Sequence, residues 1–243
     1  MKKTLVFLLV VFMGVFLLTG CLTKEKVEEP ANDNISVNEY SVGDVKSEIK
    51  ENYINGTAGW DTADPDVVPL RNLKNVIVVY DGSDYGYVYG VTSDGTGLYF
   101  KVNTNLEIKD TFNATGRPYF TERDQNKGYF EYRFSIAQSD SEVATTVKGN
   151  IPWDKADYLT MDNLPGMNNL GNLVIFEGKY LGKDNYGHFD FDLNNDGNSD
   201  VKVVKYSLMP ALIENNTYEV KGVVGYNYGF KIYVGDSSFV TEK

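Results

Sequence analysis

Short runs of alternating apolar and polar residues make up most of the chain. From about residue 67 onward, segments rich in Val, Tyr and Phe are separated by Asp-Gly, Asn-Gly or single Gly residues. Alternation with a period of two is typical of strands with one buried face, and Gly-containing dipeptides are typical of hairpin turns. The pattern predicts a body built from many short β-strands.

One earlier segment has a helical period instead. Its apolar side chains recur every three to four residues, at Val42, Val45, Ile49 and Tyr53. Ser41 and Asp44 stand at the spacing of a capping box, and Asn55-Gly56 is a helix stop signal. We therefore expect a short N-terminal helix and a loop within residues 41–66.

The first 20 residues follow neither pattern. Lys2 and Lys3 precede an almost unbroken apolar run from Leu5 to Leu18. A membrane-spanning helix needs about 20 apolar residues, so this run is too short to cross a bilayer. A basic start followed by a short apolar stretch is typical of a secretory signal peptide, and we expect residues 1–20 to be removed.

The residues around the expected cut, Leu18-Thr19-Gly20-Cys21, resemble the bacterial lipobox. That resemblance implies cleavage before Cys21, a lipid on its thiol, and an exported protein anchored to the cell membrane or the outer membrane. An uncleaved anchor helix is the alternative. The following residues are charged, contain Pro30 and lack an apolar period, so residues 21–40 are predicted to be the lipidated cysteine and a flexible tether.

Charge restricts the partners of the mature chain. Loss of the first 20 residues leaves 21 basic residues against 34 acidic ones, a formal net charge of −13. Such a field repels phosphate backbones, so the balance disfavours nucleic acid as a ligand. Cys21 is the only cysteine, so no disulfide is expected and stability must come from packing or from a bound metal.

A faint internal repeat runs through the β-rich part. Five matched segments recur in the same order, with offsets of about 100 residues: Asn72–Val76 with Asn169–Leu173, Tyr85-Gly86 with Tyr186-Gly187, Asp94-Gly95 with Asp196-Gly197, Thr111-Phe112 with Thr217-Tyr218, and 140–143 with 236–240. Repeats of this length indicate two copies of one structural unit. We place the copies at residues 67–145 and 169–243, with a linker at 146–168; chance matching of Gly and Asn is the alternative.

Each copy reads as about five strands. Their order, with the phrase TYEVKGVVGYNYGFKIYV in the second copy, resembles the OB-fold domains of bacterial secreted nucleases and envelope lipoproteins. This resemblance implies an all-β protein with two small five-stranded OB-like barrels in tandem after the short helix. An immunoglobulin-like sandwich is the rival, but it needs seven strands in about 100 residues.

The sharpest local motif is an Asp/Asn loop of the form D-x-N-x-D-G-x-x-D. Oxygen ligands at alternate positions and a central Gly are what Ca²⁺ requires of a single loop. The motif resembles the calcium loops of integrin-type propeller repeats. On that resemblance a structural Ca²⁺ is held by Asp192, Asn194, Asp196 and Asp200 through side chains and by Asn198 through its carbonyl. A plain hairpin turn is the alternative, since Val203 replaces the bidentate Glu of an EF-hand.

Clustered aromatic residues are the candidate ligand-binding groups. They are Tyr85, Tyr87 and Tyr89 in one predicted strand and Tyr226, Tyr228 and Phe230 at the last predicted hairpin. OB-folds bind nucleic-acid strands or sugars by stacking on such surfaces. Packing in a barrel core is the competing explanation.

Catalytic signals are weak. His188 is the only histidine, it lies on a predicted strand beside carboxylates, and no nucleophile elbow, zinc-protease motif or phosphate loop is present. We assign no catalytic residue. The sequence favours a noncatalytic envelope lipoprotein that binds a carbohydrate, a peptide or another envelope protein; an OB-fold nucleic-acid-binding accessory and an extracellular hydrolase are the alternatives.

Overall fold

The computed structural model describes residues 39–54, 68–137, 142–204 and 209–243. The predicted signal peptide, Cys21 and nearly all of the predicted tether lie outside the described residues. No helix in the described ranges has both the length and the apolar character needed to cross a membrane. Val37–Lys243 forms a single compact unit, which holds every element described below.

The predicted helix is confirmed as α2 (Val42–Ile54). Its first turn is closed by a reciprocal pair of bonds, because the backbone N–H of Ser41 donates to Asp44 Oδ2 at 2.9 Å and that of Asp44 donates to Ser41 Oγ at 3.0 Å. These bonds satisfy N–H groups that a helix start otherwise leaves unpaired. Val42, Val45 and Ile49 are fully buried and anchor the helix on the core of the first sheet.

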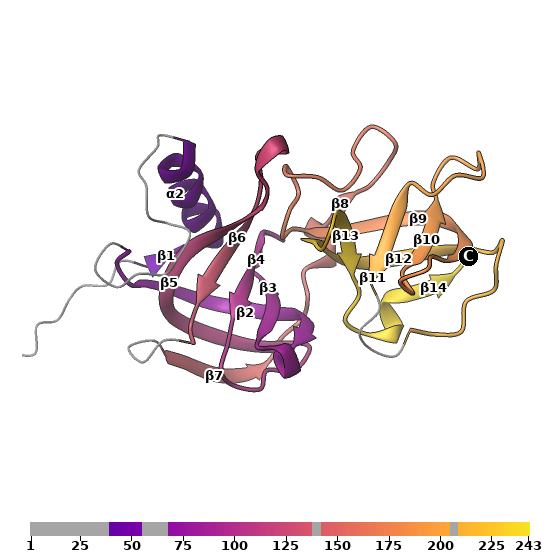
Figure 1. Cartoon of the computed structure of the whole chain (residues 1–243). Coiled ribbons are helices and arrows are strands. Elements are labelled where there is room, and N and C mark those ends of the chain that lie inside the picture. The colour runs from indigo at the N-terminus through magenta and orange to yellow at the C-terminus, as the bar shows by residue number, and fades with distance from the viewer. Residues whose placement is uncertain (1–38, 55–67, 138–141, 205–208) are drawn as a thin grey trace, which may run out of the picture. The chain divides into compact units, whose positions relative to one another are not determined.

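The first sheet contains a closed five-strand barrel. The sheet has seven strands: β1 (Glu39–Tyr40), β2 (Arg71–Gly82), β3 (Tyr87–Val91), β4 (Gly97–Lys101), β5 (Asp110–Asp124), β6 (Tyr129–Ser135) and β7 (Glu142–Lys148). The barrel consists of β2 to β6. The spatial order is β1-β2-β3-β4-β6-β5-β7, and pairing of β2 with β5 closes the ring. The barrel is mixed, because β4 and β6 run parallel while its other neighbours are antiparallel. Figure 1 shows these strands in violet and magenta.

The second sheet repeats this order with shorter strands. They are β8 (Asp157–Tyr158), β9 (Leu173–Lys183), β10 (Phe189–Asp192), β11 (Val201–Val204), β12 (Thr217–Tyr226), β13 (Phe230–Tyr233) and β14 (Val240–Glu242). The order β8-β9-β10-β11-β13-β12-β14, with β9 paired to β12, matches the first sheet strand for strand. The parallel pair β11–β13, however, spans only two residue pairs.

The second sheet is therefore a ring of strands and not a closed barrel, which corrects the expectation of two barrels. Three of its strands, β10, β11 and β13, have only four residues each, and β11 and β13 meet over two residue pairs, so a short ladder holds this side of the ring. The coarser part of the prediction is confirmed, since the described residues are mostly β with one short α-helix.

The turns of the two sheets also correspond. Gly86 and Gly187 follow the first long strand of each sheet, and both have a positive φ, 79° and 82°. Asp94-Gly95 and Asp196-Gly197 lie between the next two strands, again with a left-handed Gly at 80° and 87°. Glycine adopts this conformation without the clash that a Cβ causes. The residues matched in the predicted repeat thus occupy equivalent turns.

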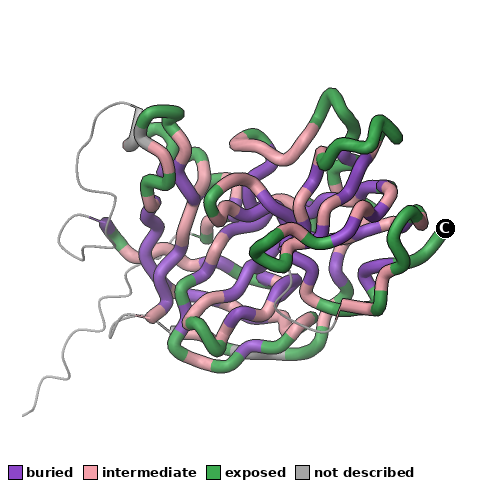
Figure 2. The backbone as a smooth tube through the Cα atoms, turned by 45° about the vertical axis from the view of Figure 1, so that its right-hand side comes forward, coloured by how far each residue is buried: buried purple, intermediate pink, exposed green. Residues whose placement is uncertain are grey.

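Two hydrophobic clusters hold the unit together. One fills the first barrel, and the other fills the second sheet but also contains Val79, Tyr80 and Tyr89 from the first. In Figure 2 the buried segments, in purple, follow the strands, while exposed segments lie mainly in the connections. Because side chains of β2 and β3 belong to the second cluster, the two sheets share a core.

Close backbone approach also joins the sheets. A Cβ on Gly97 would lie 2.4 Å from the carbonyl oxygen of Gly171, and one on Gly171 would lie 2.3 Å from that of Gly97. Lys46 of α2 adds side-chain bonds to Leu170 O at 2.8 Å and Asn172 Oδ1 at 2.6 Å. The residues predicted to be a linker take part as well, since β7 ends at Lys148 and the Trp153 ring packs on Phe239 at 5.0 Å.

Candidate ligand-binding site

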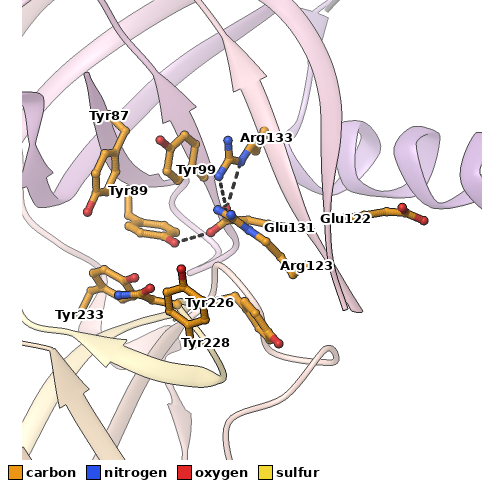
Figure 3. Close-up of a pocket in the computed structure, with 11 residues that line it drawn as sticks. Tyr87, Tyr89, Tyr99, Glu122, Arg123, Glu131, Arg133, Tyr226, Tyr228 and Tyr233 are labelled. Atoms are coloured by element: carbon orange, nitrogen blue, oxygen red, sulfur yellow. Dashed lines mark hydrogen bonds and ion pairs between the residues drawn. The ribbon is translucent and has the colours of Figure 1, made fainter. Parts of the chain in front are cut away.

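A pocket of about 390 Å³ lies where the first sheet faces the β12–β13 hairpin. We call it the tyrosine pocket, because six tyrosines line it: Tyr87, Tyr89, Tyr99, Tyr226, Tyr228 and Tyr233. Glu122, Arg123, Glu131, Arg133 and Asn227 complete its wall. Figure 3 shows the tyrosines of the first sheet on one side, those of the second sheet on the other, and the charged groups beside them.

The pocket wall formed by the first sheet results from the alternation of side chains along its strands. Tyr87 and Tyr89 stand two residues apart on β3, and Tyr99 of β4 is the direct cross-strand partner of Tyr89. The Tyr87 and Tyr99 rings stack at 4.7 Å with an angle of 11°, and Tyr89 meets Tyr99 edge-on at 5.6 Å. Aromatic pairs in these geometries contribute about 0.5–1.5 kcal/mol beyond area burial, so the three rings form a firm apolar wall.

A buried carboxylate organises the charged side. Glu131, only 1% exposed, accepts a 2.6 Å hydrogen bond from the Tyr89 hydroxyl at Oε1. Its Oε2 accepts from Arg123 Nη2 at 2.6 Å and from Arg133 Nη2 at 2.7 Å and Nε at 3.0 Å. The Arg133 guanidinium also lies 4.1 Å from the centre of the Tyr99 ring. Bonds between ionised partners are stronger than neutral ones, so this network fixes both guanidiniums.

The network brings two guanidiniums to the wall of the pocket. Two guanidiniums share the single Glu131 carboxylate, and the other acid, Glu122, points away from the cluster in Figure 3. Burial lowers the pKa of Arg133, but the charge of Glu131 more than offsets this and the pKa is raised. Arg133 therefore stays cationic.

The tyrosine hydroxyls stay protonated. Burial, and then the negative charge of Glu131, raise the pKa of Tyr89 far above its ordinary value. Burial also raises the pKa of Tyr99, against the opposing charge of Arg133. These hydroxyls are hydrogen-bond donors at neutral pH. The pocket thus offers flat ring faces, phenol groups and guanidiniums, which suit binding better than proton transfer.

The opposite wall is the tip of the β12–β13 hairpin. Tyr228 stands there with φ 52° and is 99% exposed, and the neighbouring turn is closed by Asn227 N donating to Gly229 O at 2.9 Å. A non-Gly residue with positive φ is uncommon and marks a tightly constrained tip. The hairpin is held against β6 by ring contacts of Tyr129 with Phe230 at 5.0 Å and with Tyr226 at 6.1 Å.

The structure brings four of the six predicted aromatic residues together, namely Tyr87, Tyr89, Tyr226 and Tyr228. Tyr85 does not share their surface, because it ends a 3₁₀ turn (Ser83–Tyr85) and is 70% exposed outside the pocket. Phe230 lies behind Tyr226, at 5.1 Å, and supports the hairpin.

Sequence reasoning missed Tyr99, Tyr233 and the three members of the charged cluster. A signal for the cluster was present, because Glu131 and Arg133 occupy alternate positions in the strand YFEYRFS, between aromatic residues. Charged side chains on one face of an aromatic strand indicate either that this face is exposed to solvent or that it contains a buried ion pair. Only the position of Arg123 on the paired strand β5 identifies it as the latter.

The Asp/Asn loop folds as a turn closed by its own hydrogen bonds. Asp192, almost fully buried, accepts from the backbone N–H groups of Asn194, Asn195 and Gly197 at 3.0, 2.7 and 2.8 Å. Burial raises the pKa of Asp192, but these bonds outweigh it and the pKa is lowered. Asp200 accepts from Leu193 N at 2.8 Å.

Calcium binding by this loop stays a prediction of the sequence. In the described part of the chain, no three or more His, Cys, Asp or Glu side chains are grouped so that they can hold a metal ion. Asp196 bonds within the loop, accepting from Asn198 N at 2.8 Å and from Asn194 Nδ2 at 3.1 Å.

His188 lies apart from the tyrosine pocket. Its Nδ1 is 3.0 Å from Asp184 Oδ2, and the same oxygen accepts from Lys202 Nζ at 3.0 Å. Burial raises the pKa of Asp184, but hydrogen bonds from His188 and Lys202 outweigh it and hold the pKa well below its usual range. The pocket that contains this pair is lined by no Ser, Thr or Cys hydroxyl or thiol.

Comparison of the sequence with known protein families and with curated proteins finds no match, so the site is interpreted from its own chemistry.

Proposed function

We propose that the protein is a noncatalytic envelope lipoprotein whose two related sheets form a carbohydrate-binding module, with the tyrosine pocket as its ligand site. The proposal rests on one observation: tyrosines from distant parts of the chain line the same pocket. Tyr87 and Tyr89 line it together with Tyr226 and Tyr228, which lie well over 100 positions later, and with Arg133. Ligand sites combine apolar and aromatic walls with a few placed polar groups.

Sugar rings suit this wall better than other ligands do. They have flat apolar faces that pack on aromatic rings, and hydroxyl groups that exchange hydrogen bonds with phenols and guanidiniums. The exposed ring of Tyr228 offers such a face. The half-buried rings of Tyr87 and Tyr99 are stacked on each other and offer their edges and hydroxyl groups. Peptides and envelope proteins are the other ligands that an exported binding module meets, and the experiment below separates them.

A binding role fits the acid groups of the pocket. A general base must have a free lone pair within reach of the substrate. Glu131 instead accepts four hydrogen bonds from Tyr89, Arg123 and Arg133, and is nearly inaccessible. The hydrolase alternative rests on His188, whose pocket is lined by no Ser, Thr or Cys side chain.

The anchoring part of the proposal rests on Cys21 and the lipobox-like residues before it. Two or three acyl chains hold a protein stably on a bilayer without any help from its folded part. We further propose that both sheets are OB-like domains that arose by duplication, because all seven strands occur in the same order in each. In this account the tether leaves the duplicated body free to meet ligands.

The charge of the protein argues against the nucleic-acid alternative. Tight binding of a single strand needs a basic groove along its backbone. The tyrosine pocket has two arginines and two glutamates in its wall, and the mature chain as a whole carries −13.

Calorimetric titration of the purified protein tests the proposal. The probes are neutral and acidic hexasaccharides, a mixed hexapeptide pool and a hexathymidylate. We expect saccharides to bind, and Tyr87→Ala to weaken that binding at least tenfold, about 1.4 kcal/mol. Tyr85→Ala is the matched control, since Tyr85 is a neighbouring exposed tyrosine that does not line the pocket. Equal binding by both variants, or binding of peptides or the nucleotide alone, contradicts the proposal.

A further inference from the structure

A second pocket, of about 670 Å³, lies on the second sheet. We call it the Lys231 pocket. It is lined by the turn between β9 and β10, by Lys202 of β11, and by the β12–β13 hairpin with Lys231. Nothing in the proposed function uses this pocket.

Lys231 is a buried cation without a carboxylate partner. Its side chain is 5% exposed and its ammonium donates to the carbonyl oxygen of Asn227. No carboxylate of a described residue lies within ion-pair distance of it. Burial lowers the pKa of Lys231, the charge of Asp184 partly restores it, and Lys202 lowers it further. A buried charge is stable when it is paired, so an anion in this pocket supplies what the protein does not.

The other charges of the pocket are already matched. Lys202 Nζ donates to Asp184 Oδ2 at 3.0 Å and to Asp190 Oδ1 at 2.7 Å. His188 is bonded to the same Asp184 oxygen at 3.0 Å. A ligand anion therefore has one obvious partner, the ammonium of Lys231, and it also meets the carboxylate of Asp184 in the pocket wall. This arrangement accepts isolated negative charges and repels dense ones.

Two exposed tyrosines border the pocket. Tyr186 is 87% exposed and Tyr228 is 99% exposed. Large exposed rings beside a cation are typical of surfaces that bind a flat ring bearing an anionic group, because the ring packs on the aromatic face while the charge meets the cation.

The two pockets have a common wall, since Asn227 and Tyr228 line both. We propose that the Lys231 pocket is a second subsite for the ligand of the tyrosine pocket, and that this ligand is a saccharide chain bearing carboxylate groups. The proposal rests on the function proposed above and adds its ligand class. One carboxylate of the chain pairs with Lys231, and a sugar ring packs on Tyr186 or Tyr228. Arg123 and Arg133 provide the matching cations in the tyrosine pocket.

A polyphosphate is a poorer fit than a polyuronate. A phosphomonoester carries nearly two negative charges where a uronate residue carries one. Lys231 offers a single positive charge, and the carboxylate of Asp184 already acts on it.

Three probes of similar length test the inference by calorimetry: hexagalacturonate, its fully methyl-esterified and therefore uncharged form, and hexathymidylate. We expect hexagalacturonate to bind at least tenfold more tightly than the ester. Lys231→Met keeps a long apolar stem and should erase that preference. Lys50→Met removes an exposed lysine of α2 as the matched control and should change neither value.

Tyr186→Ala gives a second test that does not disturb the core, because the side chain is exposed and lines only the Lys231 pocket. It should weaken hexagalacturonate binding severalfold at an unchanged melting temperature. The inference is overturned if Lys231→Met keeps the full preference for the acid, or if hexathymidylate binds more tightly than hexagalacturonate. Equal binding of acid and ester, or binding of neither while the neutral hexasaccharide binds, overturns this inference alone. Binding of no saccharide overturns the proposed function as well.

Discussion

The phenolic hydroxyl of Tyr89 donates a 2.6 Å hydrogen bond to Oε1 of Glu131, across the strand β4 that separates them. The Tyr89 ring also contacts Tyr233 of the second sheet at 5.0 Å. One tyrosine thus connects the charged cluster of the first barrel with the core shared by both sheets. Changes at Glu131 are therefore expected to affect folding and the shape of the pocket together.

Replacing Glu131 by Gln should lower the free energy of unfolding by about 2–3 kcal/mol. Removing one partner of a buried pair leaves unmatched charge and costs about 3–5 kcal/mol. We expect less here because the Arg123 and Arg133 side chains are 29% and 15% exposed, so solvent screens them in part.

Urea unfolding measures this loss. Glu122→Gln is the control, since Glu122 is an exposed acid at the end of the same cluster, and it should cost well under 1 kcal/mol. Equal decreases in the free energy of unfolding in the two variants would show that the Glu131 network stabilises the fold no more than an exposed acid does.

Lys46 should make stability depend on pH. Burial lowers its pKa from 10.5 to about 7 in the folded state, against the raising effect of Asp94 and Asp157. Between these two values the unfolded chain keeps the proton that the folded chain releases, so the free energy of unfolding rises with pH.

The comparison with Lys46→Met isolates this contribution. The variant also lacks the bonds to Leu170 and Asn172, but that loss does not vary with pH once the group is absent. We expect the difference between wild type and variant to grow in favour of the wild type from pH 7 to pH 9.5, measured by urea unfolding. A difference that stays constant over this range would refute the lowered pKa.

Local sequence patterns predicted the elements well. Ser41 and Asp44 predicted the start of the helix, and the matching turns at Gly86 and Gly187 predicted the repeat. Both signals are local, because a helix cap or a left-handed Gly depends on only a few adjacent residues. The prediction that the second sheet closes into a barrel was wrong. Strands of four residues, such as β10 and β11, cannot be distinguished in the sequence from longer strands bounded by the same turns.

The site could be predicted only in part, because its chemistry depends on contacts between distant residues. Aromatic clustering identified Tyr87 and Tyr228, but nothing local shows that Arg123 reaches Glu131 or that Lys231 lacks an acid partner. Such pairings are set by strand order, and the order β4-β6-β5 places neighbours that are not consecutive in the chain side by side.

Calcium provides a direct test of the Asp192–Asp200 loop. If the loop binds Ca²⁺ as the sequence predicts, free calcium at 100 times its Kd should add about 2.7 kcal/mol to the free energy of unfolding, and a chelator should remove this gain. The double variant Asp196→Asn, Asp200→Asn should lose the response. A melting temperature that is the same with calcium and with chelator would leave the loop as a hydrogen-bonded turn.

Cys21→Ser should release the protein from membranes without unfolding it. The predicted anchor is the lipid on this thiol, and the predicted tether separates it from the folded residues. Fractionation of broken cells should move the protein from the membrane to the soluble fraction, with an unchanged far-ultraviolet circular dichroism spectrum. Retention of the variant in the membrane fraction would argue for an uncleaved anchor helix.

The most direct measurement of the central claim is ¹⁹F NMR of protein labelled with 3-fluorotyrosine, titrated with hexagalacturonate and assigned by single Tyr→Phe variants. The account predicts that the signals of Tyr87, Tyr99, Tyr226 and Tyr228 shift together along one binding curve while that of the exposed Tyr85 stays in place. Unchanged pocket signals, or a shift of Tyr85 equal to theirs, would contradict it.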